Sequence, residues 1–191
     1  MDHSRAVAEA LAALSARGNL AAAEVITRAY PFAPTVPNKR KVRLVDALGV
    51  FIRDGFIDRY TGQRLVFPGV LCLLSEMLPK EFPYHPNWKT DETHLAYWEL
   101  FPTIDHLVPV SLGGADDLSN WVTTSMLRNA AKANSVLADL GWQLQPPGDM
   151  ETWDGLLGAF LEYTRRHPGE PRTAALRRWR NAARAAAPRS S

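Results

Sequence analysis

The chain has a single cysteine, Cys72, among its 191 residues. One cysteine excludes an intrachain disulfide framework and a cysteine-rich zinc finger. Long hydrophobic runs are missing too, since no stretch approaches the roughly 18 apolar residues of a membrane span. The N-terminus also lacks the compact apolar run of a secretory signal. We therefore expect a cytoplasmic protein with no membrane partner.

An excess of charge of either sign is also missing. The 22 Lys and Arg residues nearly balance the 20 Asp and Glu residues, and the resulting net charge of +2 predicts no partner. Basic residues do gather around 39–43 and in the arginine-rich stretch 151–191. Two such clusters are compatible with a polyanionic partner, although solvated helix faces have the same composition.

The composition that remains, 46% apolar and 22% charged, is that of an ordinary globular protein. Periodicity, Pro and Gly divide the chain into a helical arm with a proline-rich linker (1–38), a central region (39–145) and basic C-terminal helices (146–191), which we expect to pack as one domain. The expected helices are 4–17, 20–29, 41–53, 70–78, 93–100, 125–139, 151–166 and 171–186. A hairpin around Thr61-Gly62 and a strand at 103–110 make the fold class α+β, mainly helical.

Two helices have side chains of one kind at helical spacing. In the first helix, an apolar stripe at i, i+4 and i+7 indicates the helical period, and it consists of Val7, Leu11 and Leu14. In the last helix, three arginines form a basic face: Arg177, Arg180 and Arg184. This face could contact the phosphates of a nucleic acid without recognising its base sequence.

The residues that suggest chemistry lie at 102–134. Asp105 and the side-chain oxygen of Asn129 are hard oxygen ligands, which Mg²⁺ and Mn²⁺ prefer. His106 titrates near neutral pH and is a candidate base for a water that attacks a phosphodiester. Neighbouring residues on a strand point to opposite faces, so Asp105 and His106 converge on one phosphate only where the strand ends or bends. Each residue alone is more often structural, and the signal lies in the set.

As a set, these residues resemble the HNH endonuclease family of the ββα-metal superfamily. The family pattern is Asp-His, a hydrophobic residue, Pro, Gly-Gly, a central Asn, and a final Asn or His beside a Lys. The matching residues here are Asp105-His106-Leu107-Val108-Pro109, Gly113-Gly114, Asn120, Asn129 and Lys132. The resemblance is strong over roughly 102–134 and weak over 53–67.

The resemblance implies a ββα-metal (HNH) core with flanking N- and C-terminal helices. It implies a metal-dependent endonuclease that hydrolyses DNA to 5′-phosphate and 3′-hydroxyl ends. Asp105 and Asn129 would hold one divalent metal ion, Mg²⁺ or Mn²⁺, and His106 would be the general base. Asn120 would tie down the loop between the strands and orient His106.

Two basic residues lie beside the second metal ligand on the expected helix. Lys132 is three residues after Asn129 and shares its face, so we expect it to contact a phosphate of the nucleic acid. Arg128 is a second candidate for such a contact, although a solvated side chain explains it equally well.

The chain departs from many relatives in lacking two Cys-x-x-Cys pairs that bind a structural zinc ion. The corresponding stretches, 58–61 and 125–128, contain no cysteine, so no structural zinc is expected. Apolar packing is expected to replace it, with the candidates Tyr60, Leu65, Trp121 and Leu127. Position 133 is Ala, where some relatives have another His. The insert 70–100 is expected to cover the core or to form a wall for the substrate.

Other functions stay open from the sequence. The chain could be a non-catalytic nucleic-acid-binding module with an HNH-like fold, or a nuclease directed at RNA. It could also be an interaction protein whose basic helices bind a partner other than nucleic acid. A homodimer is equally compatible with the sequence.

Overall fold

The computed structural model describes residues 3–32 and 42–186. The chain divides into two compact units, Met1–Arg40 and Lys41–Ser191, which are described separately. Of the basic cluster predicted at 39–43, residues 39–41 lie outside the described residues. Arg43 forms an ion pair with Asp46 at 2.8 Å.

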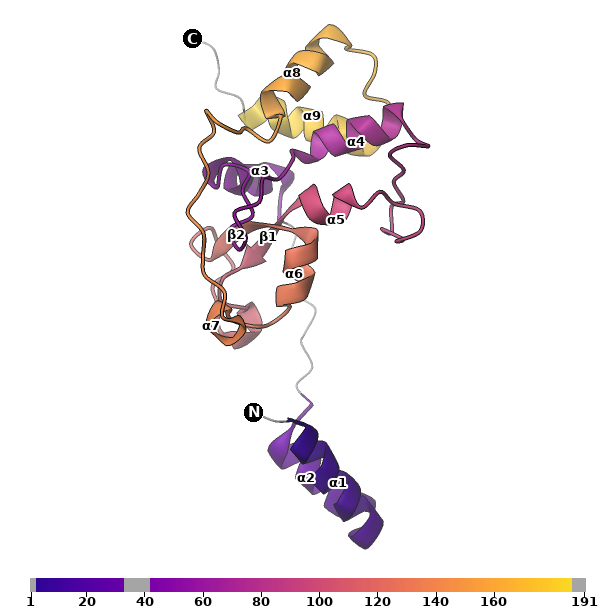
Figure 1. The fold of residues 1–191 in the computed structure, drawn as a ribbon, viewed down its shortest axis with the longest axis vertical. Helices are drawn as coiled ribbons and strands as arrows, with labels where there is room; N and C mark the ends of the chain where they lie inside the picture. The colour runs from indigo at the N-terminus through magenta and orange to yellow at the C-terminus, as the bar shows by residue number, and fades with distance from the viewer. Residues whose placement is uncertain (1–2, 33–41, 187–191) are drawn as a thin grey trace. The chain divides into compact units, whose positions relative to one another are not determined.

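The first unit is a pair of packed helices, α1 (His3–Arg17) and α2 (Asn19–Ala29), shown in Figure 1. Its small core consists of Ala10, Ala13 and Val25. The predicted helix 4–17 is confirmed, and its apolar stripe is exposed at all three positions: Val7, Leu11 and Leu14. Alanines let the two helices approach closely, and the larger side chains are left outside the contact.

The second unit is an α+β fold in which the described residues form one two-stranded antiparallel sheet. Its elements are α3 (Leu44–Arg53), α4 (Pro68–Met77), α5 (Ala96–Leu100), β1 (Pro102–His106), the 3₁₀ turn η1 (Val110–Leu112), β2 (Trp121–Ser125), α6 (Met126–Lys132), α7 (Leu137–Leu140), α8 (Leu157–Arg166) and α9 (Ala174–Ala186). Asp105 lies opposite Val122 in the sheet, and His106 lies opposite Trp121. Among the described residues, we find no helix long and apolar enough to cross a membrane.

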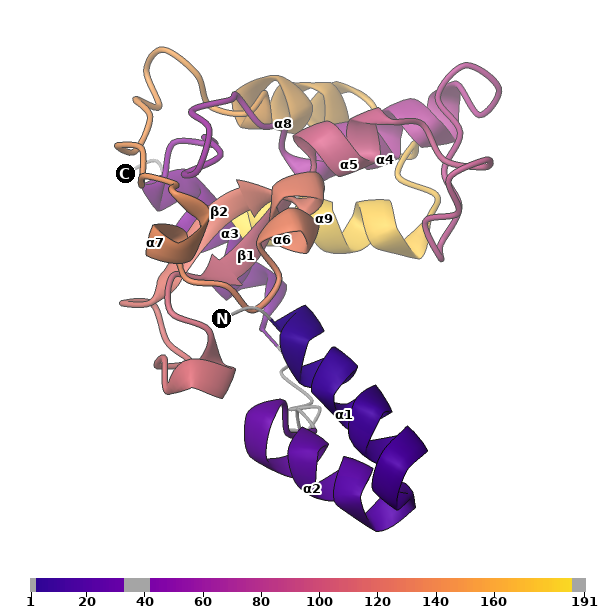
Figure 2. The same ribbon diagram turned by 60° about the horizontal axis from the view of Figure 1, so that its bottom comes forward.

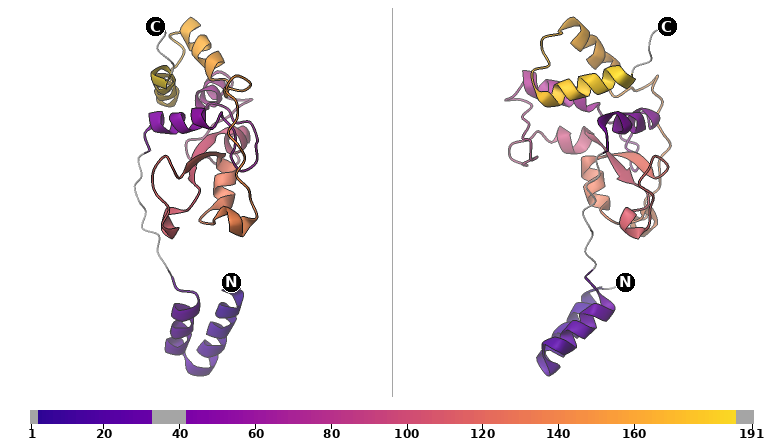
Figure 3. Two further views of the ribbon diagram at one scale, coloured as in Figure 1. Left: turned by 90° about the vertical axis from the view of Figure 1, so that its left-hand side faces the viewer. Right: turned by 180° about the vertical axis from the view of Figure 1, so that it is seen from behind.

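The main core lies between α3, α4, α8 and α9. Its buried residues are Leu48, Phe51, Phe56, Phe67, Leu157, Phe160, Leu176, Trp179, Ala182 and Ala183. Helix α9 packs on α3 and α4, and α3 packs on β1 and β2, so α3 separates α9 from the sheet (Figure 3). The basic residues of α9 are therefore on the far side of α3 from the residues of the HNH pattern.

The predicted insert covers part of this core. Tyr97 is fully buried and contacts Phe82, and His94 stacks on Phe82 with ring centroids 4.4 Å apart. Phe101 joins these rings to Trp179 of α9, at 6.3 Å. The aromatic side chains of the insert are thus packing residues.

Three predicted elements differ from those observed. The helix predicted at 125–139 is split into α6 and α7, because Ala133 has a φ of 48°, which no α-helix allows. The hairpin around Thr61-Gly62 is a turn with a single bridge between Ile57 and Arg64. The predicted strand 103–110 ends at His106, before Pro109.

The turn after α3 is held by a buried carboxylate. The Asp58 side chain is completely buried and accepts hydrogen bonds from the backbone N–H of Tyr60 and of Ser125, each at 3.0 Å. It also accepts one from the Thr124 hydroxyl at 3.1 Å. These bonds join the stretches 58–61 and 125–128, where the resemblance to the HNH pattern invited comparison with zinc-binding Cys-x-x-Cys pairs. Of the candidates for apolar packing here, Tyr60 and Leu65 are buried, whereas Leu127 is 50% exposed, so polar bonds to Asp58 accompany the apolar packing.

Candidate active site

Helix α6 follows β2 without a loop and lies beside both strands (Figure 2). Its first turn is capped by Ser125, whose hydroxyl accepts a hydrogen bond from the backbone N–H of Arg128. Asn129 and Lys132 are three residues apart and share the face of α6 that contacts β1. The sheet and α6 thereby bring three residues of the predicted set together: Asp105, Asn129 and Lys132.

The amide of Asn129 is oriented by two hydrogen bonds. Its Nδ2 donates to the Thr103 hydroxyl at 3.0 Å and to the carbonyl oxygen of Ile104 at 3.2 Å. A carbonyl oxygen can only accept, so the nitrogen must face β1. The Asn129 Oδ1 atom is left without a hydrogen-bond partner among the described residues and can act as a ligand.

The carboxylate of Asp105 has one engaged and one available oxygen. Its Oδ2 accepts a hydrogen bond from the Tyr60 hydroxyl at 2.6 Å and lies 3.0 Å from the Lys132 ammonium. Burial raises the pKa of Tyr60 far above its usual range, and the hydrogen bond to Asp105 raises it further, so the phenol stays protonated and donates. Oδ1 of Asp105 has no partner within the described part of the chain.

Lys132 has a completely buried side chain. Besides its ion pair with Asp105, its ammonium donates a hydrogen bond to the carbonyl oxygen of His106 at 2.7 Å. These partners compensate a charge that is costly to bury unpaired. Lys132 thus holds the end of β1 and does not present its ammonium to solvent, which differs from the predicted phosphate contact.

His106 is the last residue of β1 and lies where the strand ends. Its Nε2 lies 2.8 Å from Oδ1 of Asp116. The Trp121 indole nitrogen lies 2.9 Å from His106 Nε2 and 3.3 Å from the same carboxylate oxygen. Nε2 of His106 therefore lies between the indole N–H of Trp121, which donates toward it, and the carboxylate of Asp116.

The loop from β1 to β2 is closed by Asn120. Its Oδ1 accepts from the Val108 N–H at 2.9 Å, and its Nδ2 donates to the carbonyl oxygens of Val108 and Ala115, both at 2.8 Å. Gly114 lies so close that a Cβ there would be 1.9 Å from the Val108 oxygen. Asn120 therefore acts on His106 only through the loop, and the glycine leaves room for this closure.

Arg128 is exposed, and its guanidinium carbon lies 5.5 Å from the ring centre of Trp142. Sequence reasoning missed the contacts made by Tyr60, Asp116 and Trp142. A carboxylate ten residues from a candidate base is a weak signal that could have indicated Asp116. No local pattern links Tyr60 to Asp105 across 45 residues.

The residues present fit a sparsely held hard cation. No group of three or more His, Cys, Asp or Glu side chains able to hold a metal ion is found in the described residues. One carboxylate oxygen and one amide oxygen are enough where water and substrate phosphate complete the coordination shell, as is usual for Mg²⁺. Comparison with known proteins found no matching family, no matching curated protein and no matching solved structure.

Proposed function

We propose that this protein is a metal-dependent endonuclease that hydrolyses phosphodiester bonds of DNA in a ββα-metal core. One observation carries the proposal. Along β1, Asp105 and Asn129 each have one oxygen atom without a hydrogen-bond partner in the described residues, and the strand ends at a histidine paired with a carboxylate. The resemblance of residues 102–134 to the HNH pattern supports the assignment of phosphodiester hydrolysis to this arrangement.

Each residue of the candidate active site has a separate role in this proposal. His106 takes the proton of the attacking water, and Asp116 stabilises the resulting imidazolium. Asp105 and Asn129 would hold one Mg²⁺ or Mn²⁺, which supplies charge stabilisation at the phosphate when bound. Lys132 and the Tyr60 hydroxyl hold the Asp105 carboxylate in place.

Nicking of supercoiled plasmid with Mg²⁺, Mn²⁺ or EDTA tests the proposal. We expect metal-dependent nicking, with 5′-phosphate and 3′-hydroxyl ends. His106→Ala should lower the rate about 10²–10⁴-fold if it removes the general base. Asn129→Ala should require more metal, whereas Asn134→Ala, which changes an exposed amide nearby, should cut like the parent. If Asn129→Ala also cuts like the parent, the metal ligands are misassigned.

A non-catalytic nucleic-acid-binding module is the second candidate function. The ion pair between Lys132 and Asp105 favours it, because an ammonium already neutralises much of the carboxylate that would bind a cation. Mn²⁺ titration followed by calorimetry separates the two. The nuclease predicts binding that Asn129→Ala weakens, and the module predicts salt-sensitive nucleic-acid binding without metal binding or cleavage.

A further inference from the structure

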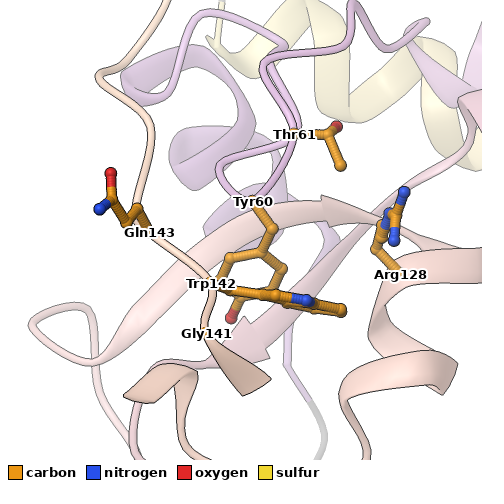
Figure 4. Close-up of a pocket in the computed structure, with 6 residues that line it drawn as sticks. All are labelled: Tyr60, Thr61, Arg128, Gly141, Trp142 and Gln143. Atoms are coloured by element: carbon orange, nitrogen blue, oxygen red, sulfur yellow. The ribbon is translucent and has the colours of Figure 1, made fainter. Parts of the chain in front are cut away.

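A second pocket lies next to the candidate active site. It has a volume of about 390 Å³ and is lined by Tyr60, Thr61, Arg128, Gly141, Trp142 and Gln143 (Figure 4). This volume is within the range of small-molecule sites in proteins. Figure 4 shows the Trp142 indole edge-on, with Thr61 on one side of its plane and with Arg128 and Gln143 at opposite ends.

The chain holds Trp142 firmly in this position. Its backbone N–H donates to the carbonyl oxygen of Leu137 at 2.9 Å, and Gly141 before it has a φ of 64°. Its ring lies 5.7 Å from the ring of Tyr60, measured between centroids. Three residues later, Gln145 is joined to Arg59 by bonds of 2.7 and 2.6 Å. A half-buried indole held in this way is a preformed surface for stacking.

Three polar groups of the pocket have no hydrogen-bond partner in the described residues: the Arg128 guanidinium, the indole N–H of Trp142 and the side-chain amide of Gln143. The first two can only donate, and the amide can both donate and accept. No acidic residue lines the pocket. A flat aromatic face together with unpaired donors and one cation suits a planar ligand that carries acceptors and negative charge. A nucleotide, with its base and its phosphate, has this chemistry.

The pocket shares a side chain with the candidate active site. The Tyr60 ring lines the pocket, whereas its hydroxyl donates to Asp105. Arg128 of the pocket directly precedes Asn129. Along one strand, the base of a nucleotide and the neighbouring phosphate are joined by a single sugar. A strand whose phosphate reaches Asp105 and Asn129 can therefore extend its next base to Trp142.

We infer that this pocket binds an unpaired nucleobase next to the phosphate that is cut. Trp142 stacks on the base, and the exposed Arg128 turns from the indole to a backbone phosphate. Duplex bases are stacked on one another, so the pocket selects DNA that is single-stranded or has an unpaired base at the cut. This inference rests on the proposed function for the identity of the neighbouring phosphate.

Binding without cleavage tests the inference. Fluorescence anisotropy in EDTA, with the His106→Ala protein, compares a labelled single strand with a strand of equal length built from abasic nucleotides. We expect about tenfold tighter binding of the strand with bases. Trp142→Leu keeps an apolar side chain against Tyr60 but has no aromatic face, so it should abolish this preference, and Trp142→Phe should retain most of it.

A matched control is Trp98→Leu, which changes a half-buried tryptophan of α5 and should keep the preference for bases. Equal affinity of the parent for both strands overturns the inference, whether or not the variants fold. A preference that survives Trp142→Leu overturns it as well. If the protein nicks plasmid but shows no base-dependent binding through Trp142, the inference about the pocket is wrong and the proposed nuclease function is retained. If base-dependent binding through Trp142 occurs but no metal supports cleavage, the proposed function is wrong and the pocket is retained as a nucleobase-binding site.

Discussion

Replacing Asp58 by alanine is expected to lower the free energy of unfolding by about 3 kcal/mol. The substitution leaves two buried backbone N–H groups, of Tyr60 and Ser125, without an acceptor, and it also removes the partner of the Thr124 hydroxyl. A buried donor left unsatisfied costs about 1–3 kcal/mol. The hydroxyl can rotate to another acceptor, so the two N–H groups dominate. Relief from no longer burying a carboxylate offsets part of the loss.

Urea denaturation followed by tryptophan fluorescence measures this change, and a thermal melt should shift by about 6–12 °C for a chain of this size. Asp58→Asn keeps one acceptor oxygen and should lose about half as much. The control is Asp91→Ala, which removes an exposed carboxylate and should change stability by less than about 0.5 kcal/mol. A loss below about 1 kcal/mol in Asp58→Ala would refute the reasoning, because the turn would then be held by its apolar neighbours.

Three further changes have defined outcomes. Burial tends to raise the pKa of Glu76, but hydrogen bonds from the backbone N–H groups of Arg172 and Thr173 lower it overall, below its ordinary value of 4.5. Urea titrations should therefore show Glu76→Gln losing about 1 kcal/mol of stability at pH 7 and progressively less as the pH falls below about 4.5, where the carboxylate protonates in either state. Ala133→Gly should raise the thermal midpoint, with a gain of about 0.5–1 kcal/mol, because glycine tolerates the positive φ at this position; an unchanged or lower midpoint would contradict this. Gly114→Ala should reduce plasmid nicking about 10²-fold without unfolding the protein, because the added Cβ forces open the loop that Asn120 closes beside His106.

Local pattern was sufficient to predict much of the fold. The helical periods of α1, α2, α8 and α9 are visible in the sequence, with boundaries within a few residues at most ends. The face shared by Asn129 and Lys132 follows from their i, i+3 spacing alone. Which face of a helix is buried depends on packing. In α1, Val7, Leu11 and Leu14 show the helical period, but close contact between two helices favours alanine, so the buried face is formed by Ala10 and Ala13.

In the candidate site, too, some residues are indicated by the local sequence, whereas their contacts depend on the tertiary fold. Asp105, His106 and Asn129 could be named as candidates, because they lie within one short pattern of side chains with known chemistry. Their partners could not. Tyr60 reaches Asp105 from a turn 45 residues earlier, and Trp142 reaches Tyr60 from beyond α7. Such contacts depend on where turns bring the chain back, which hydrophobic spacing does not encode.

The carboxylate that anchors the turn at Asp58 makes folding of this region independent of metal supply. Cross-links through cysteine-bound zinc are lost to chelators, and the protein around them unfolds. Here the same two stretches are joined by hydrogen bonds to Asp58, which a chelator cannot remove. In the proposed nuclease, EDTA would therefore strip the cation from Asp105 and Asn129 without disturbing the scaffold, and adding metal back should restore activity with no refolding step.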